Sequence, residues 1–153
     1  MIFMKKMFLI FTLVLIDQII KKIVILNIEK DHFIEIIRDF FYLWNVRNYG
    51  AAFSIFDGKL LLLILIGLLA SIYLIYLIIK KEDQLAYYFL FAGLLGNLID
   101  RIFLGYVIDY LGFEFIGYRF PIFNFADILI TLSAVYIIYS ILKEEFTHGT
   151  HSK

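Results

Sequence analysis

The chain has 153 residues, of which 63% are hydrophobic and 19% aromatic, and its formal net charge is zero. Soluble domains are closer to half apolar, so this composition indicates a membrane protein, and the length allows one domain over 1–153. The neutral charge balance gives no indication of a nucleic-acid partner. The absence of cysteine excludes disulfides and thiol chemistry.

Lys5 and Lys6 precede a first apolar run that resembles a signal sequence, but no small-x-small cleavage motif follows it, so we expect an uncleaved span. Four apolar segments each have about the twenty residues that a helix needs to cross a bilayer. The sequence therefore predicts an α-helical integral membrane protein with four transmembrane helices, over 7–26, 60–79, 85–104 and 122–142. Four spans place both termini on one side, whereas the count of Lys and Arg on the two sides does not settle which side.

The connection between the first two spans predicts a small sheet. Residues 40–48, "FFYLWNVRN", are aromatic-rich and partly alternating, which is typical of a strand, and "NYG" predicts a turn after it. Residues 51–56 predict a short interfacial helix. We expect the sheet to lie on the membrane face, because an open strand edge is not tolerated within the hydrocarbon.

Charged and polar side chains inside the apolar segments need an explanation, because a charge at the centre of a bilayer helix costs about 2.5–3.5 kcal/mol. In the predicted topology these side chains all lie toward the membrane face that holds the first and third connections. They are Asp17, Gln18, Lys21, Asn97, Asp100, Arg101, Asn124 and Asp127. The other half of the bundle is nearly pure hydrocarbon, and this asymmetry predicts a site near one surface.

Asp127 has a shallow predicted depth. A helix from Leu142 back to Asp127 rises about 22 Å at 1.5 Å per residue. In a hydrocarbon core about 30 Å thick, Asp127 then lies about 8 Å inside. This places a carboxylate below the headgroups but within reach of the surface.

Two of the polar groups also have a structural interpretation. Asp17 and Lys21 are four residues apart, as in a helix ion pair. Asn97, Asp100 and Arg101 share one helix face, where the arginine is suited to hold carboxylates and backbone carbonyls in a structural clamp. Intramembrane ionisable groups either pair or take part in function, and the sequence leaves both open here.

The acids near the fourth segment have structural alternatives as well. Asn124 followed three residues later by Asp127 has the spacing of a capping box at a helix start. Asp109 lies between hydrophobic neighbours in "YVIDYLGF", and a turn in the third connection would hold it harmlessly in solvent.

Two carboxylates brought together at this depth can share a proton, because like charges a few ångströms apart do not both ionise easily. Such a pair can activate water against a peptide carbonyl. Asp127 lies in the first turn of a helix, where the dipole favours an anion, so we expect Asp127 to act as the base and Asp109 to hold the proton. No histidine lies in a span, and no HExxH motif, Ser–His pair or cysteine is present, so other hydrolytic schemes fit poorly. We expect no cofactor.

Four motifs occur in order along the chain: "DQIIK", "NYGAAFS", "GNLIDRIFLGYVIDY" and "FPIFNFAD". Together they resemble bacterial lipoprotein signal peptidase, the type II signal peptidase, over nearly the whole chain. The resemblance implies an aspartyl protease of the bacterial cytoplasmic membrane, with four helices, cytoplasmic termini and a β-cradle on the extracytoplasmic face. It implies cleavage of prolipoproteins just before the diacylglyceryl-modified cysteine, no metal, inhibition by globomycin, and a monomer in contact with membrane lipid.

Carried onto this chain, the catalytic aspartates of the family match Asp109 and Asp127. Its supporting polar positions and loop turn match Asp17, Asn48, Gly50, Asn97, Asp100, Arg101 and Asn124. The chain departs from the family pattern at Ile20, where threonine is frequent, and at Tyr49, where a small residue is frequent. Tyr49 is in a position to narrow the entry or contact the substrate lipid.

Two other classes of protein remain open from the residues alone. A non-enzymatic proton-relay or transporter subunit would use the carboxylates to move protons, but the polar groups gather at one face and form no continuous path. A structural scaffold with every carboxylate capped or paired accounts for Asn124 and Asp127 but not for Asp109.

Overall fold

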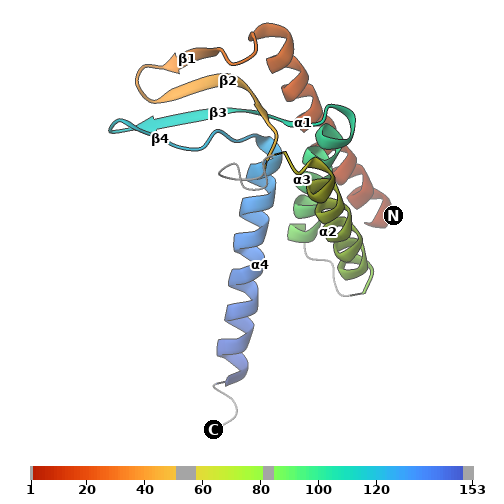
Figure 1. The fold of residues 1–153 in the computed structure, drawn as a ribbon. Helices are drawn as coiled ribbons and strands as arrows, with labels where there is room; N and C mark the ends of the chain where they lie inside the picture. Colours follow the sequence, from red (N-terminus) through yellow and green to blue (C-terminus); the bar gives the residue numbers. More distant parts are fainter. Residues whose placement is uncertain (1, 51–57, 81–84, 150–153) are drawn as a thin grey trace.

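The computed structural model describes residues 2–50, 58–80 and 85–149, and Figure 1 shows a helical bundle with a sheet at one end. The elements are α1 (Ile2–Asn27), β1 (Phe33–Ile37), β2 (Phe41–Asn48), α2 (Leu60–Lys80), α3 (Leu85–Phe103), β3 (Val107–Phe115), β4 (Tyr118–Arg119) and α4 (Phe125–Gly149). The first turns of α1 and the last turns of α4 lie away from the sheet, as the predicted topology requires. The interfacial helix predicted over 51–56 lies outside the described residues.

Three helices among the described residues, α2, α3 and α4, are long and apolar enough to cross a membrane. Three of the four predicted segments are therefore helices with the length and composition of a membrane span. Although α1 has 26 residues, its apolar part carries Asp17, Lys21 and Lys22. The helix is present where the sequence predicted it, but its composition does not confirm that it crosses, and this remains a prediction.

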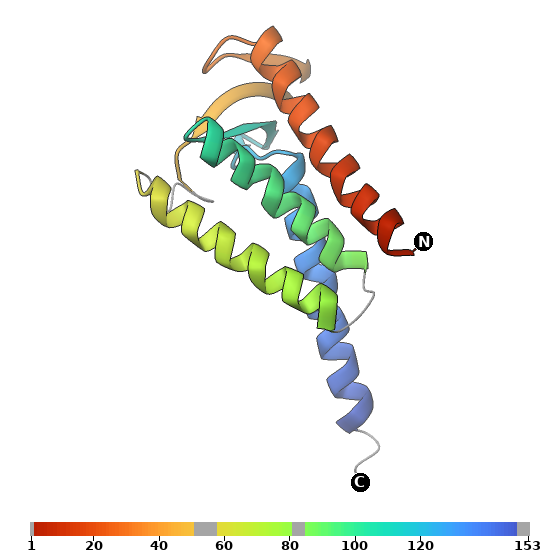
Figure 2. The same ribbon diagram turned by 90° about the vertical axis from the view of Figure 1, so that its right-hand side faces the viewer.

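The helix α3 lies at the centre of the bundle and packs against α1, α2 and α4 (Figure 2). Tyr88, Phe91 and Ala92 of α3 join a buried apolar cluster with Ile10 of α1 and Leu74 of α2. Helices α2 and α4 leave most of their other large apolar side chains exposed, as expected of surfaces that face lipid. The bundle therefore buries α3 and presents α2 and α4 outward.

The sheet has four antiparallel strands in the order β1-β2-β3-β4. Strand β2 confirms the strand predicted over 40–48. The interpretation that places Asp109 in a solvent-exposed turn is wrong, because Asp109 belongs to β3 and pairs with Val46 of β2.

The two faces of β3 have different neighbours. Ile108 and Tyr110 point toward α1, where they pack with Val24 and Ile28 in a second buried cluster. Because side chains alternate along a strand, Asp109 points to the opposite face. The packing of β3 on α1 thus directs the Asp109 carboxylate toward the head of α4.

Gly93 allows α3 and α4 to approach closely. A Cβ atom at Gly93 would lie 2.6 Å from the Ala126 carbonyl oxygen and 2.8 Å from Ile130 Cγ1. We expect Gly93→Ala to destabilise the protein by about 1–3 kcal/mol, because the α4 backbone must move. Gly67→Ala is the control, since its Cβ would meet only the Leu98 side chain, at 3.2 Å. Melting temperatures in detergent will compare the variants, and equal losses would contradict the role of the close backbone contact.

Candidate active site

Asp109 and Asp127 come from different elements, β3 and the first turn of α4. The backbone N–H of Asp127 donates to Asn124 Oδ1 at 3.0 Å, and the backbone N–H of Asn124 donates to Asp127 Oδ2 at 3.1 Å. This reciprocal pair is a capping box, so the capping interpretation of the spacing is confirmed. Capping uses one oxygen of Asp127 and leaves the other available to the site.

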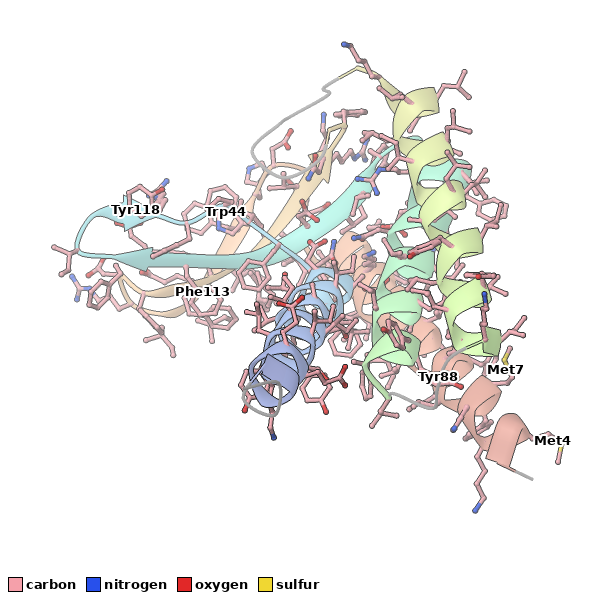
Figure 3. All side chains as sticks on the ribbon, turned by 90° about the horizontal axis from the view of Figure 1, so that it is seen from below. Met4, Met7, Trp44, Tyr88, Phe113 and Tyr118 are labelled. Carbon is pink, nitrogen blue, oxygen red and sulfur yellow. The ribbon has the colours of Figure 1, made fainter. Side chains whose placement is uncertain are left out.

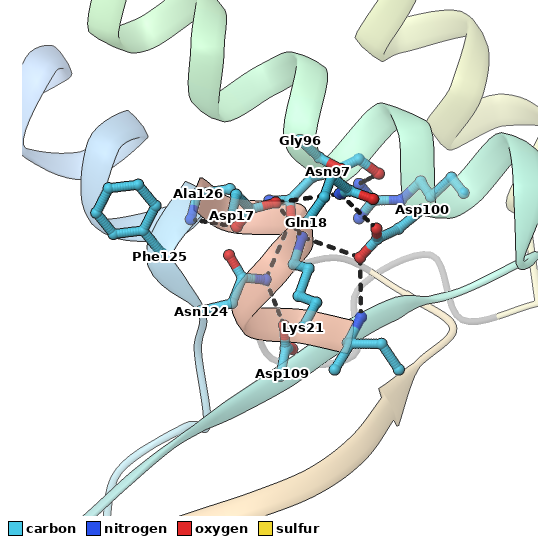
Figure 4. A network of polar contacts seen from close by, with 12 residues as sticks. Asp17, Gln18, Lys21, Gly96, Asn97, Asp100, Asp109, Asn124, Phe125 and Ala126 are labelled. Atoms are coloured by element: carbon cyan, nitrogen blue, oxygen red, sulfur yellow. Dashed lines mark hydrogen bonds and ion pairs between the residues drawn. The ribbon is translucent and has the colours of Figure 1, made fainter. Parts of the chain in front are cut away.

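Two asparagine amides link the carboxylates, and Figure 4 shows the one of Asn124 between Asn97 and Asp109. Asn124 is fully buried, and its Nδ2 donates to Asp109 Oδ1 at 2.7 Å and to Asn97 Oδ1 at 3.1 Å. Asn97 Nδ2 in turn donates to Asp127 Oδ1 at 2.8 Å. In each amide the NH₂ group faces a carboxylate oxygen, so the partners determine which end donates and which accepts. The two amides therefore fix the orientation of the carboxylates relative to each other.

The first connection supplies a second support for Asp109. Asn48 Nδ2 donates to Asp109 Oδ2 at 2.8 Å, while Asn48 Oδ1 accepts the backbone N–H of Gly50 at 2.9 Å. Arg101 Nη2 donates to the Gly50 carbonyl at 3.0 Å. Arg101 thus holds the turn that positions Asn48, and it acts as the predicted clamp on backbone carbonyls.

A buried group of charges lies next to these amides (Figure 4). Lys21 Nζ is 2.8 Å from Asp17 Oδ2, 2.9 Å from Asp100 Oδ2 and 3.1 Å from Asn97 Oδ1. The predicted pair of Asp17 with Lys21 is therefore confirmed, and Asp100 is a second partner. Lys21 and Gln18 were noted in the sequence as costly polar groups but were not predicted as site residues. Gln18 Nε2 donates to Asp100 Oδ1 at 2.9 Å.

The charged group also holds the two elements that carry the site carboxylates. Asp17 Oδ1 accepts the backbone N–H of Ala126 in α4 at 3.1 Å. Asp100 Oδ2 accepts the backbone N–H of Ile108 in β3 at 3.2 Å. The residues that flank Asp127 and Asp109 are thereby tied to the same buried lysine.

A cavity of about 960 Å³ opens beside the carboxylates. Its polar wall includes Asn48, Asn97, Arg101, Asp109 and Asp127, and its other lining side chains are mostly apolar. Tyr49 also lines the cavity, and its ring lies 5.4 Å from that of Tyr106, in keeping with a position at the entry. The described residues contain no group of three or more His, Asp or Glu side chains placed to hold a metal ion.

The carboxyl group of Asp109 is difficult to ionise. Burial, and next the negative charge of Asp127, raise the pKa of Asp109 from its ordinary value of 3.8 to about 7, against the opposing effect of the Asn48 and Asn124 hydrogen bonds. A carboxyl with such a pKa holds its proton for much of the time near neutral pH. The raised pKa of Asp109 favours it as the holder of the shared proton, and this division of roles stays a prediction.

The raised pKa predicts how stability depends on pH. A folded-state pKa above the unfolded value means that protonation of Asp109 stabilises the folded protein below about pH 4, and that this stabilisation is lost as the pH rises to about 7. Asp109→Asn lacks this titration. We therefore expect the melting temperature of Asp109→Asn, relative to that of the unmodified protein, to rise over this pH range. Parallel melting curves for the two proteins would contradict the prediction.

Comparison with known proteins identifies the family of this chain. The model of the family described as signal peptidase (SPase) II matches residues 9–143. The chain belongs to the signal peptidase II family. As a family member it is a membrane protease that removes signal peptides. The lipoprotein signal peptidases of Staphylococcus aureus strains JH9 and Newman are each 38% identical to it over 136 residues, which cover 86% of this chain and 83% of theirs.

Two solved structures described as bacterial membrane enzymes share the fold of this signal peptidase II. The first, at 2.3 Å resolution, superposes with a TM-score of 0.85 at 35% identity, over 92% of this chain and 89% of its own. The second, at 1.9 Å resolution, has a TM-score of 0.81 at 35% identity, over 91% of this chain and 93% of its own. The family match spans every one of the four sequence motifs.

Proposed function

We propose that the protein is an aspartyl endopeptidase that removes the signal peptide from diacylglyceryl-modified prolipoproteins, cutting before the lipidated cysteine. The observation that carries the proposal is the pair of carboxylates, Asp109 and Asp127, linked by two amides at the polar wall of a largely apolar cavity. The relatives' name, lipoprotein signal peptidase, supports the substrate class.

In the proposed mechanism Asp127 removes a proton from the water that hydrolysis consumes, and the oxygen of that water attacks the scissile carbonyl carbon. Asp109 donates its proton to the carbonyl oxygen, so that a tetrahedral gem-diol forms. The C–N bond then breaks while Asp127 returns its proton to the departing amine and Asp109 recovers a proton from the diol. Both carboxyl groups end as they began, and no metal takes part.

The supporting residues act on orientation in this proposal. Asn48, Asn97 and Asn124 hold the two carboxylates, while Arg101 holds the turn at Gly50. Asp17 and Asp100 hold the adjacent backbone of α4 and β3. The apolar part of the cavity would receive the lipid and signal peptide of the substrate, and an inhibitor of the globomycin type would compete there.

In the membrane, we infer that all four helices of this single-domain monomer cross the bacterial cytoplasmic membrane, with cytoplasmic termini. The sheet and the site then lie near the extracytoplasmic face. Burial of Asp17 and Lys21 against α3 supports a spanning α1, because their charges face protein and not lipid. The proton-relay alternative lacks such support, since residues 61–79, 85–96 and 128–142 contain no charged side chain.

A cleavage assay tests the proposed function. The purified protein is mixed in detergent with a precursor bearing diacylglyceryl on its cysteine, and the products are measured by mass spectrometry. We expect two products separated immediately before the modified cysteine, and no cleavage of the same precursor without lipid. A correctly folded preparation that leaves the lipidated precursor intact would overturn the proposal.

A further inference from the structure

The sheet ends in two hairpin turns of different character. The turn between β1 and β2 contains Arg38 and Asp39, whose side chains are 91% and 83% exposed. The turn between β3 and β4 consists of Ile116 and Gly117, and Ile116 is 89% exposed. The β1–β2 turn therefore exposes two charged side chains beside Phe40, which is 42% exposed, whereas the β3–β4 turn presents only Ile116 and a glycine.

The backbone conformation at residue 116 is unfavourable for isoleucine. Ile116 and Gly117 have φ angles of 51° and 75°, as in the two-residue turn of type I′, which favours asparagine or glycine at both positions. A β-branched residue with positive φ is strained. Because Ile116 is so exposed, contacts within the described chain offset little of this strain. An apolar surface outside the protein would offset it.

The hairpin around this turn has one apolar and one charged face. Phe115 pairs with Tyr118 on one face, and both are more than half exposed. Glu114 pairs with Arg119 on the other face, where Arg119 Nε lies 2.8 Å from Glu114 Oε2. Aromatic side chains on one face and charges on the other suit the boundary between lipid and water.

The apolar face continues inward toward the membrane-spanning helix α4. Five phenylalanine rings line a hollow of about 360 Å³ that extends from the hairpin to the residues just before α4. They are Phe40, Phe113, Phe115, Phe120 and Phe123. Beyond Phe125, where α4 begins, exposed side chains such as Leu132 and Val135 are also apolar. The hollow thus joins the hairpin to the residues that precede a helix apolar enough to cross a membrane.

The figures show what lies beneath the hairpin. In Figure 1, β3 and β4 extend sideways from the head of α4 and form the edge of the sheet nearer to that helix, with β1 on the opposite edge. Figure 3, seen from below, shows Tyr118 well clear of the helical bundle. The hairpin therefore extends clear of the helical bundle, and with α4 across a membrane its tip would have lipid beneath it.

We propose that the β3–β4 turn is an interfacial membrane anchor, in which Ile116 inserts into the leaflet below and Phe115 and Tyr118 lie at headgroup level. The partner is the lipid leaflet. Charged Glu114 and Arg119 then face water. Asp109 lies on the same strand, β3. By holding the far end of this strand at the membrane surface, the anchor helps to set the depth of the Asp109 carboxylate in the membrane.

Site-directed labelling tests this anchor on the full chain, which has no cysteine to replace. Ile116→Cys and the control Asp39→Cys are labelled with a nitroxide and reconstituted in phosphatidylcholine–phosphatidylglycerol vesicles. We expect the label at residue 116 to be relaxed several-fold more by oxygen than by a water-soluble nickel chelate, and the reverse at residue 39. Equal nickel accessibility would overturn the proposal, as would spin–spin broadening at residue 116, which would indicate a second copy.

A second variant separates the anchor from the stability of the turn. Ile116→Asn introduces the residue that a type I′ turn prefers, so the melting temperature in detergent should not fall. A nitroxide at Tyr118→Cys should nevertheless become several-fold more accessible to nickel when Ile116→Asn is added in vesicles. Unchanged accessibility in the folded double variant would contradict the anchor.

Discussion

Replacing Asp127 by asparagine is expected to reduce cleavage of the lipidated precursor by about 10²–10⁴-fold, the range for loss of a general base. The same loss is expected for Asp109→Asn, because the carbonyl oxygen would lose its proton donor. Asp39→Asn is the matched control, since its carboxylate is exposed on a turn of the same sheet. The measurement is kcat/KM by mass spectrometry of the cleaved precursor.

Asp127→Asn also disturbs the capping box, because an amide nitrogen would face the backbone N–H of Asn124. Capping substitutions cost about 1 kcal/mol, which a melting temperature in detergent would detect. A loss of stability of this size does not explain a loss of activity of at least a hundredfold in a folded protein. Activity that persists in both folded variants would remove the carboxylates from the mechanism.

The division of roles within the pair can be tested by pH–rate profiles of Asp109→Glu and Asp127→Glu. If Asp109 holds the shared proton, its variant should move the alkaline limb of the profile and the Asp127 variant the acidic limb. Equal movement of the same limb in both variants would show that the two carboxyl groups are not distinguishable in this way.

The helices and one strand of the fold could be predicted because their patterns are local. Runs of about twenty apolar residues gave helices close to the observed bounds, and aromatic alternation gave β2. The capping box at Asn124 was equally local, because three residues of spacing determine it. The composition of α1 gives a less clear indication. Its charged residues belong to the buried group beside the site, and they make the helix less apolar than a typical membrane span.

Strand β3 could not be recognised from alternation. Residues Val107–Tyr110 are buried on both faces of the strand, so no contrast between polar and apolar positions reveals a period of two. Asp109 therefore looked like a loop residue among apolar neighbours. The contacts that give it a role, from Asn48 and Asn124, join elements distant in sequence and follow only from the tertiary fold.

The number of Lys and Arg residues on each side could not predict the orientation in the membrane, for a related reason. Lys21 and Arg101 were counted with the cations of the sheet side, yet Lys21 is buried between two carboxylates and Arg101 binds the Gly50 carbonyl. Cations used inside a protein network do not report interaction with the membrane surface. Burial, which the sequence does not reveal, decides which charges belong in such a count.

The second large effect is expected from Lys21→Met. Lys21 is 2% exposed and lies between Asp17 and Asp100, so its removal leaves two carboxylates buried without a counter-ion. Breaking a buried ion pair in this way costs about 3–5 kcal/mol. Lys22→Met is the control, because Lys22 is exposed on the same helix. Melting temperatures in detergent should separate the two variants clearly, and equal values would contradict a buried charge group.

A triple variant distinguishes a purely structural role from a positioning role. Combining Lys21→Met with Asp17→Asn and Asp100→Asn removes all three charges, so much of the lost stability should return. Activity should not return in proportion, because the amides bind the backbone N–H groups of Ala126 and Ile108 more weakly than the carboxylates do. Those two N–H groups adjoin Asp127 and Asp109, so kcat should remain low while the melting temperature recovers. Recovery of both together would mean that the lysine and its acids stabilise the bundle without orienting the catalytic pair.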